Sequence, residues 1–172
     1  NYDLSLRYRV SLHSFTPAVN PQLLPMDAPP EALKRWLGPS PMVPLGDPGM
    51  KTFVQNSTKG AVHPWEKARN LLWALVDLLE YEEDGGLTYG PEVFKDRRAS
   101  SFGYSSLLAA LGRLAGIPSR LVEGLVLGPG NKVSNKRFWV EFFIPGLCWT
   151  PADPALADEQ GQSRPVFGMR YG

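Results

Sequence analysis

Residues 97–120 read RRASSFGYSSLLAALGRLAGIPSR, and this stretch decides the fold that the sequence predicts. Its apolar side chains recur at the spacing of one helix face, which consists of Tyr104, Leu107, Leu108, Leu111, Leu114 and Ala115. Gly116 can adopt the left-handed conformation that ends a helix, and Pro118 prevents its continuation. We therefore expect a central core helix that carries Ser100 and Ser101 at its start, where either serine can act as the N-cap.

Short runs rich in β-branched and aromatic residues follow this helix. They are SRLVEGLVLG (119–128), RFWVEFFI (137–144) and LCWTPAD (147–153), and turn-forming residues separate them. Consecutive strands with such short connections predict an antiparallel meander. The final run, PVFGMRYG (165–172), is a candidate edge strand.

The segments before the central helix contain a second helix and an N-terminal strand. HPWEKARNLLWALVDLLEY (63–81) predicts a helix of about five turns that starts at Pro64. LSLRYRVSL (4–12) alternates strictly between apolar and polar residues, which predicts a half-buried strand. A proline-rich loop follows, then a short helix between Pro30 and Gly38, and we expect loop again over residues 38–49.

The composition excludes several classes of function. The 18 basic and 17 acidic residues leave a net charge of +1, and no basic stripe indicates a nucleic-acid partner. Cys148 is the single cysteine and His13 and His63 are the two histidines, so we expect no disulfide, no metal site and no cofactor. The most apolar helical stretch is interrupted by Asp77 and is far shorter than the ~20 residues of a membrane span.

Two stretches resemble the transglutaminase-like superfamily, namely LLAALGRLAGIPSRLVEG (107–124) and FWVEFFIPGLCWTPADP (138–154). The helical run from Pro64 also resembles the helix that precedes the nucleophile in bacterial members, so the likeness covers roughly residues 60–155. The resemblance implies an α+β, papain-like fold with a central helix packed against an antiparallel sheet. We expect one domain over residues 1–172, with an extension of strand and loop (1–58) and a core (59–172).

The resemblance also assigns the positions of a catalytic triad. The family's nucleophilic cysteine falls on Ser101, twelve residues before Arg113, and its histidine falls on Arg137, two residues before Trp139. The family's aspartate is retained as Asp153. A serine hydroxyl needs a general base, and a guanidinium stays protonated and only donates hydrogen bonds, so Arg137 cannot be that base. We expect instead that Arg137 forms a salt bridge with Asp153.

The substitutions favour a catalytically inactive domain that binds a protein or peptide. The residues expected around the remaining cleft are Phe102, Tyr104, Trp139 and Trp149. Two alternatives stay open: an active hydrolase or acyltransferase in which Ser101 uses an unidentified base, with His63 the nearest candidate by elimination, and a structural module of a larger polypeptide. We expect His63 to be a helix flank, and Cys148 to be buried and inert.

The compartment and the oligomeric state are not predicted by the sequence. The chain begins at Asn1 rather than at a methionine, which is compatible with a processed form or an excised piece. Many bacterial members of the resembled family are extracytoplasmic, and this gives a weak preference for the cell envelope.

Overall fold

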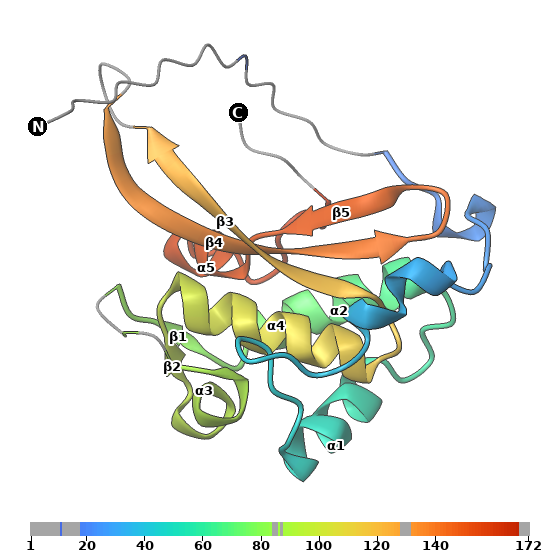
Figure 1. Cartoon of the computed structure of the whole chain (residues 1–172), viewed down its shortest axis with the longest axis horizontal. Coiled ribbons are helices and arrows are strands. Elements are labelled where there is room, and N and C mark those ends of the chain that lie inside the picture. Colours follow the sequence, from blue (N-terminus) through green and yellow to red (C-terminus); the bar gives the residue numbers. More distant parts are fainter. Residues whose placement is uncertain (1–10, 12–17, 84–85, 87, 128–131, 169–172) are drawn as a thin grey trace, which may run out of the picture.

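The computed structural model describes residues 11, 18–83, 86, 88–127 and 132–168, apart from the side chain of Ser134. Figure 1 shows the arrangement of its helices and strands. In chain order the elements are the 3-10 helices η1 (Pro21–Leu23) and η2 (Glu31–Trp36), then α1 (Pro48–Ser57), α2 (Pro64–Val76), β1 (Glu80–Tyr81), α3 (Gly90–Asp96), β2 (Arg98–Ala99), α4 (Ser101–Leu114), β3 (Ser119–Leu127), β4 (Val133–Ile144), β5 (Cys148–Ala152) and α5 (Pro154–Glu159).

The predicted meander is present as an antiparallel sheet of order β3-β4-β5. One face of this sheet lies over α4, with α2 and α5 beside that helix (Figure 1). Val140, Phe142 and Ile144 alternate along β4 and are fully buried on this face. The α+β arrangement of a central helix packed against an antiparallel sheet is therefore confirmed.

The central helix α4 is enclosed by the rest of the protein. Twelve of its fourteen residues are buried, so the helix is covered on nearly all sides and not only along the apolar face that predicted it. Gly116 ends it with a φ of 78°, and the Ile117 amide donates to the carbonyl of Gly112 at 2.9 Å. The buried Arg113 guanidinium fixes the C-terminal end, because it donates to the carbonyls of Ser119 and Gly38.

Gly112 marks the closest approach of α4 to the sheet. A Cβ at this position would collide with the Ser119 hydroxyl and the Phe142 ring. Gly112→Ala is therefore expected to lower the free energy of unfolding by about 1–3 kcal/mol, although alanine is the better helix former. Urea unfolding measures the difference, and Gly46→Ala is the control because no atom lies within 4 Å of its Cβ position. Equal midpoints for the two variants would contradict the close packing.

Helix α2 starts where the sequence predicted and ends earlier. The His63 ring accepts from the Trp65 amide at 3.0 Å, and the Glu66 carboxylate accepts from the His63 amide at 3.3 Å, which completes a capping box. The helix stops at Val76 rather than near Tyr81, because Glu80–Tyr81 pair in parallel with Arg98–Ala99. This pairing places β1 beside the start of α4, where it contributes to the site described below.

The N-terminal third contains a helix that the sequence did not predict. Asp47 caps α1 by accepting from the Gly49 amide at 2.6 Å, and Pro48 occupies the first helical position. Met50 and Val54 are buried in the same apolar cluster as α2 and α4. The buried core therefore extends to the N-terminal side of residue 59. The predicted helix after Pro30 is present as η2, whereas the predicted strand 4–12 lies outside the described residues, apart from residue 11.

Two predictions for the C-terminal third are wrong. Residues 165–168 of the candidate edge strand are not a strand, because Pro165 has no amide hydrogen and Phe167 turns inward onto the rings of Trp65 and Phe142. Its other residues, 169–172, lie outside the described part of the chain. Cys148 is exposed rather than buried, because it lies at the β4–β5 turn with a φ of 60°. The helix α5 was also not predicted, although Asp153–Pro154 supplies its N-cap and first residue.

Candidate active site

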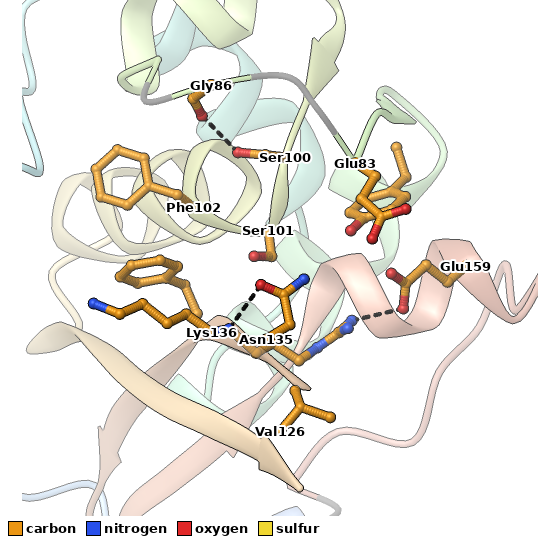
Figure 2. A pocket seen from close by; sticks show the side chains of 12 residues that line it. Glu83, Gly86, Ser100, Ser101, Phe102, Val126, Asn135, Lys136 and Glu159 are labelled. Atoms are coloured by element: carbon orange, nitrogen blue, oxygen red, sulfur yellow. Dashed lines mark hydrogen bonds and ion pairs between the residues drawn. The ribbon is translucent and has the colours of Figure 1, made fainter. Parts of the chain in front are cut away.

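A pocket of about 470 Å³ lies at the N-terminal end of α4 (Figure 2). It is bordered by β1, the ends of β3 and β4, and α5. The residues that line it are Tyr81, Glu83, Gly86, Ser100, Ser101, Phe102, Val126, Asn135, Lys136, Arg137, Phe138 and Glu159. Three of the sequence-predicted site residues, Ser101, Phe102 and Arg137, are therefore brought together here.

The two serines occupy different positions at the start of α4. Ser100 is at the N-cap, but its hydroxyl donates to the Gly86 carbonyl at 2.8 Å and does not cap the helix. Ser101 is the first helical residue, half-buried in the pocket wall. Its hydroxyl has no hydrogen-bond partner in the part of the chain that the structure describes. The expected capping bond is thus absent, and no base is held against Ser101 in this conformation.

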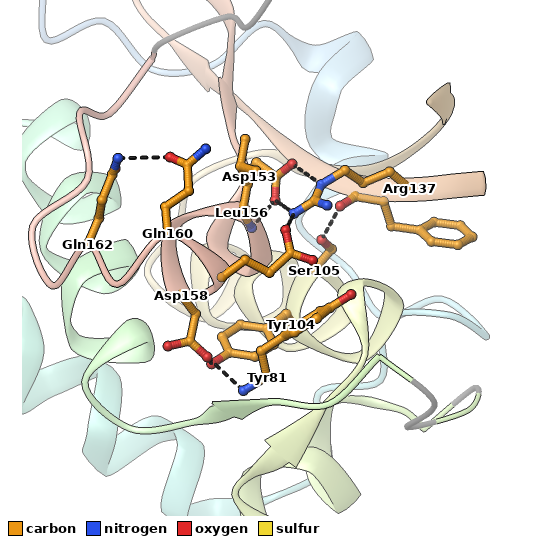
Figure 3. A network of polar contacts seen from close by, with 11 residues as sticks. Tyr81, Tyr104, Ser105, Arg137, Asp153, Leu156, Asp158, Gln160 and Gln162 are labelled. Atoms are coloured by element: carbon orange, nitrogen blue, oxygen red, sulfur yellow. Dashed lines mark hydrogen bonds and ion pairs between the residues drawn. The ribbon is translucent and has the colours of Figure 1, made fainter. Parts of the chain in front are cut away.

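Arg137 is held between two carboxylates (Figure 3). Its Nε lies 2.7 Å from Asp153 Oδ2, and its Nη2 lies 2.9 Å from Glu159 Oε2. The predicted salt bridge to Asp153 is therefore confirmed, and Glu159 is a second partner. Burial lowers the pKa of Arg137, but the hydrogen bonds and charges of both carboxylates outweigh burial and raise it. The guanidinium remains a cation throughout the working pH range.

Asp153 has a second contact that has nothing to do with Arg137. Its Oδ1 accepts from the Leu156 amide at 2.9 Å, which makes Asp153 the N-cap of α5. The side chain is 14% exposed. Asp153 therefore is the predicted partner of Arg137 and, in addition, the N-cap of α5.

Two tyrosines connect β1 and α4 to α5. The Tyr104 hydroxyl donates to Asp158 Oδ2 at 2.8 Å, and the same oxygen accepts from the Tyr81 amide at 2.6 Å. Burial raises the pKa of the Tyr81 phenol to about 12, with a further contribution from its hydrogen bond to Glu159. Burial and the hydrogen bond to Asp158 also raise the pKa of Tyr104.

The raised pKa of Tyr81 predicts a loss of stability at alkaline pH. The folded protein holds the phenolic proton more tightly than the unfolded chain, whose tyrosines titrate near 10. The stability that the Tyr81 phenol adds through this pKa difference is complete below pH 10 and is lost as the pH rises toward 12. Urea midpoints measured from pH 8 to 11.5 should fall more steeply for the wild type than for Tyr81→Phe. Parallel curves for the two proteins would show that the Tyr81 phenol contributes nothing to the pH dependence of stability.

Three residues expected in the cleft do not line this pocket. Tyr104 is fully buried, and its hydroxyl donates to the half-buried Asp158. The Trp139 ring lies against Gly124, where a Cβ would collide with it. Trp149 packs edge-on against Trp36 and lies beneath the Arg120 guanidinium. The two tryptophans lie on the sheet face opposite α4, because they alternate with the buried Val140, Phe142 and Thr150.

The remaining histidine and cysteine of the described chain are not in the pocket. His63 caps α2, and its second ring nitrogen lies 3.0 Å from the Pro25 carbonyl, so both nitrogens contact backbone groups. This agrees with the prediction of a helix flank. Cys148 follows the β4–β5 turn, at the end of β4 opposite to Lys136 and Arg137. No described residue of the lining is a histidine or a cysteine.

The sequence did not predict several residues of the pocket. Glu159 could have been found from the sequence, because Asp153–Pro154 is a helix-start signal and Glu159 is the last residue of the helix that begins there. Tyr81 and Glu83 gave no such signal, since the sequence predicted that the helix would run through Tyr81. Within the described ranges, no three His, Cys, Asp or Glu side chains gather to form a metal site. None of the described helices combines the length and the apolar character needed to cross a membrane.

Comparison with known proteins supports the resemblance seen in the sequence. The profile of the transglutaminase-like superfamily matches residues 51–154. A candidate cysteine protease from Cytophaga hutchinsonii superposes with a TM-score of 0.63 at 16% identity, over 81% of this chain and 46% of that one. The periplasmic domain of TgpA from Pseudomonas aeruginosa, bound to ethylmercury, gives 0.60 at 21% identity, over 77% and 51%.

Both matched structures are less than 25% identical to this chain. At such identities they show the fold, and the present chain spans about half the length of each matched structure. No curated protein matches the sequence.

Proposed function

The chain belongs to the transglutaminase-like superfamily, and from this premise we propose that it is a non-catalytic domain that binds an extended peptide in the pocket over Ser101. The main support for the proposal is the pair of carboxylates that Arg137 contacts. The guanidinium stands at the family's histidine position and is held by Asp153 and Glu159. A group in this state cannot accept the proton of a serine hydroxyl.

The remaining parts of the site support binding rather than chemistry. A cavity of about 470 Å³ lies within the range typical of ligand pockets. Phe102 and Phe138 form one wall, with ring centroids 5.1 Å apart in an edge-to-face arrangement. Fold and function are separable, so a scaffold that lacks the nucleophile and the base can keep its cleft for recognition.

The proposal is tested by assaying turnover and binding on the same protein. We expect no amine incorporation into glutamine-containing protein, and no hydrolysis of peptides or esters above a Ser101→Ala variant. We also expect binding of extended peptides by both proteins. Turnover that disappears in Ser101→Ala would overturn the proposal in favour of a serine enzyme with an unidentified base. Absence of peptide binding would contradict the second part of the proposal, which is that the pocket over Ser101 binds a peptide.

A further inference from the structure

The charges around the pocket do not balance. Two cations line it, Lys136 and Arg137, and each already has a carboxylate partner that does not line the pocket. Lys136 Nζ lies 2.6 Å from Glu123 Oε1, and Arg137 is paired with Asp153. The two lining carboxylates, Glu83 and Glu159, therefore remain in excess. The pocket together with these partners carries a net charge of −2.

Glu83 is the carboxylate of the lining that no cation neutralises. It is exposed, and it forms no ion pair with any residue that the structure describes. Glu159, by contrast, shares Arg137 with Asp153, so that one guanidinium serves two carboxylates. In Figure 2 Glu83 and Glu159 lie on one side of Ser101, and Phe102 lies on the other. One end of the pocket is therefore acidic, and the other combines the Phe102 ring with Lys136, whose charge is paired with Glu123.

This division fits a particular kind of peptide. A long basic side chain has an apolar stem and a charged end, so it can lie along an aromatic wall while its cation meets carboxylates. An acidic side chain would face the excess negative charge at Glu83 and Glu159 and would find no unpaired cation in the described lining. Electrostatic complementarity of this type selects among partners more than it adds affinity.

We propose that the pocket selects peptides that carry a lysine or an arginine, with the cationic end of the side chain at Glu83 and Glu159 and the neighbouring peptide against Phe102 and Phe138. This inference rests on the proposed function, because it requires that the pocket binds peptides. It adds the chemical class of the ligand and assigns Glu83 as a specificity-determining residue.

The test uses acetylated and amidated nonapeptide mixtures, in which the central position is fixed as Lys, Arg, Gln or Glu and the others are varied. Binding to the immobilised protein is measured at low and at physiological salt. The Lys and Arg mixtures should be retained about threefold to fivefold better than the Gln mixture, the Glu mixture least, and salt should reduce the preference. Glu83→Gln should lose most of the preference for Lys and Arg.

Glu82→Gln is the matched control, because this neighbouring carboxylate is exposed and does not line the pocket. It should keep the wild-type preference. Equal retention of all four mixtures, or an unchanged preference in Glu83→Gln, would overturn the inference while leaving peptide binding intact. Failure of every mixture to bind would instead overturn the proposed function and, with it, the inference.

Discussion

Replacing Arg137 by methionine is expected to lower the free energy of unfolding by about 2–3 kcal/mol. The guanidinium is 20% exposed, and its two partners, Asp153 and Glu159, are 14% and 29% exposed. The substitution leaves these carboxylates facing each other without a counter-charge, and the loss of one partner from a buried ion pair costs about 3–5 kcal/mol. We set the expected value below that range because the network is partly solvated. Chemical unfolding at neutral pH measures it.

Two further variants separate charge from packing. Arg98→Met removes a cation whose pair with Glu80 is exposed at both ends (60% and 71%), and it should change stability by less than about 1 kcal/mol. The triple variant Arg137→Met/Asp153→Asn/Glu159→Gln removes all three charges and keeps an acceptor at the α5 cap, so it should recover most of the loss. If Arg137→Met is no less stable than Arg98→Met, the network does not support the fold.

Introducing the cysteine and the histidine that the family resemblance assigns to positions 101 and 137 is expected to produce the largest change in activity. In Ser101→Cys/Arg137→His the thiol and the imidazole would line the same pocket, and Asp153 already pairs with the side chain at position 137. A positioned general base contributes about 10²–10⁴-fold. The double variant should therefore hydrolyse peptide or ester substrates at least about a hundredfold faster than Ser101→Cys alone.

The comparison requires a background without Cys148. This thiol is exposed in the wild type and would be alkylated in any assay of the engineered cysteine. In a Cys148→Ser background, the alkylation rate at pH 6 reports the thiolate at position 101 directly. Thermal unfolding of each variant checks that the fold survives the loss of Arg137. A folded double variant with no gain over Ser101→Cys would show that the scaffold no longer supports the catalytic geometry.

The sequence predicted the parts of the fold that repeat a simple period. The apolar spacing along residues 104–115 predicted α4 correctly. The runs rich in β-branched and aromatic residues predicted the β3-β4-β5 meander correctly. The Arg137–Asp153 pair was also predictable, because the resemblance placed opposite charges at adjacent positions and a guanidinium seeks a carboxylate.

Other parts depend on contacts between distant segments. The early end of α2 reflects the pairing of Glu80–Tyr81 with Arg98–Ala99, which no local pattern around Asp77 reveals. Trp149 was expected in the cleft, but its neighbours Trp36 and Arg120 hold it on the opposite face of the sheet. Glu83 forms no ion pair with a described residue, and it interacts electrostatically with Tyr81, so no local sequence pattern marks it.

Asp153 has two structural roles in this chain. It begins α5 and also anchors the side chain at position 137, so the architecture needs this carboxylate whether or not any reaction takes place. In this chain the carboxylate therefore has a structural role that does not depend on catalysis. An exchange at position 101 or 137 that keeps this carboxylate would therefore leave the start of α5 unchanged.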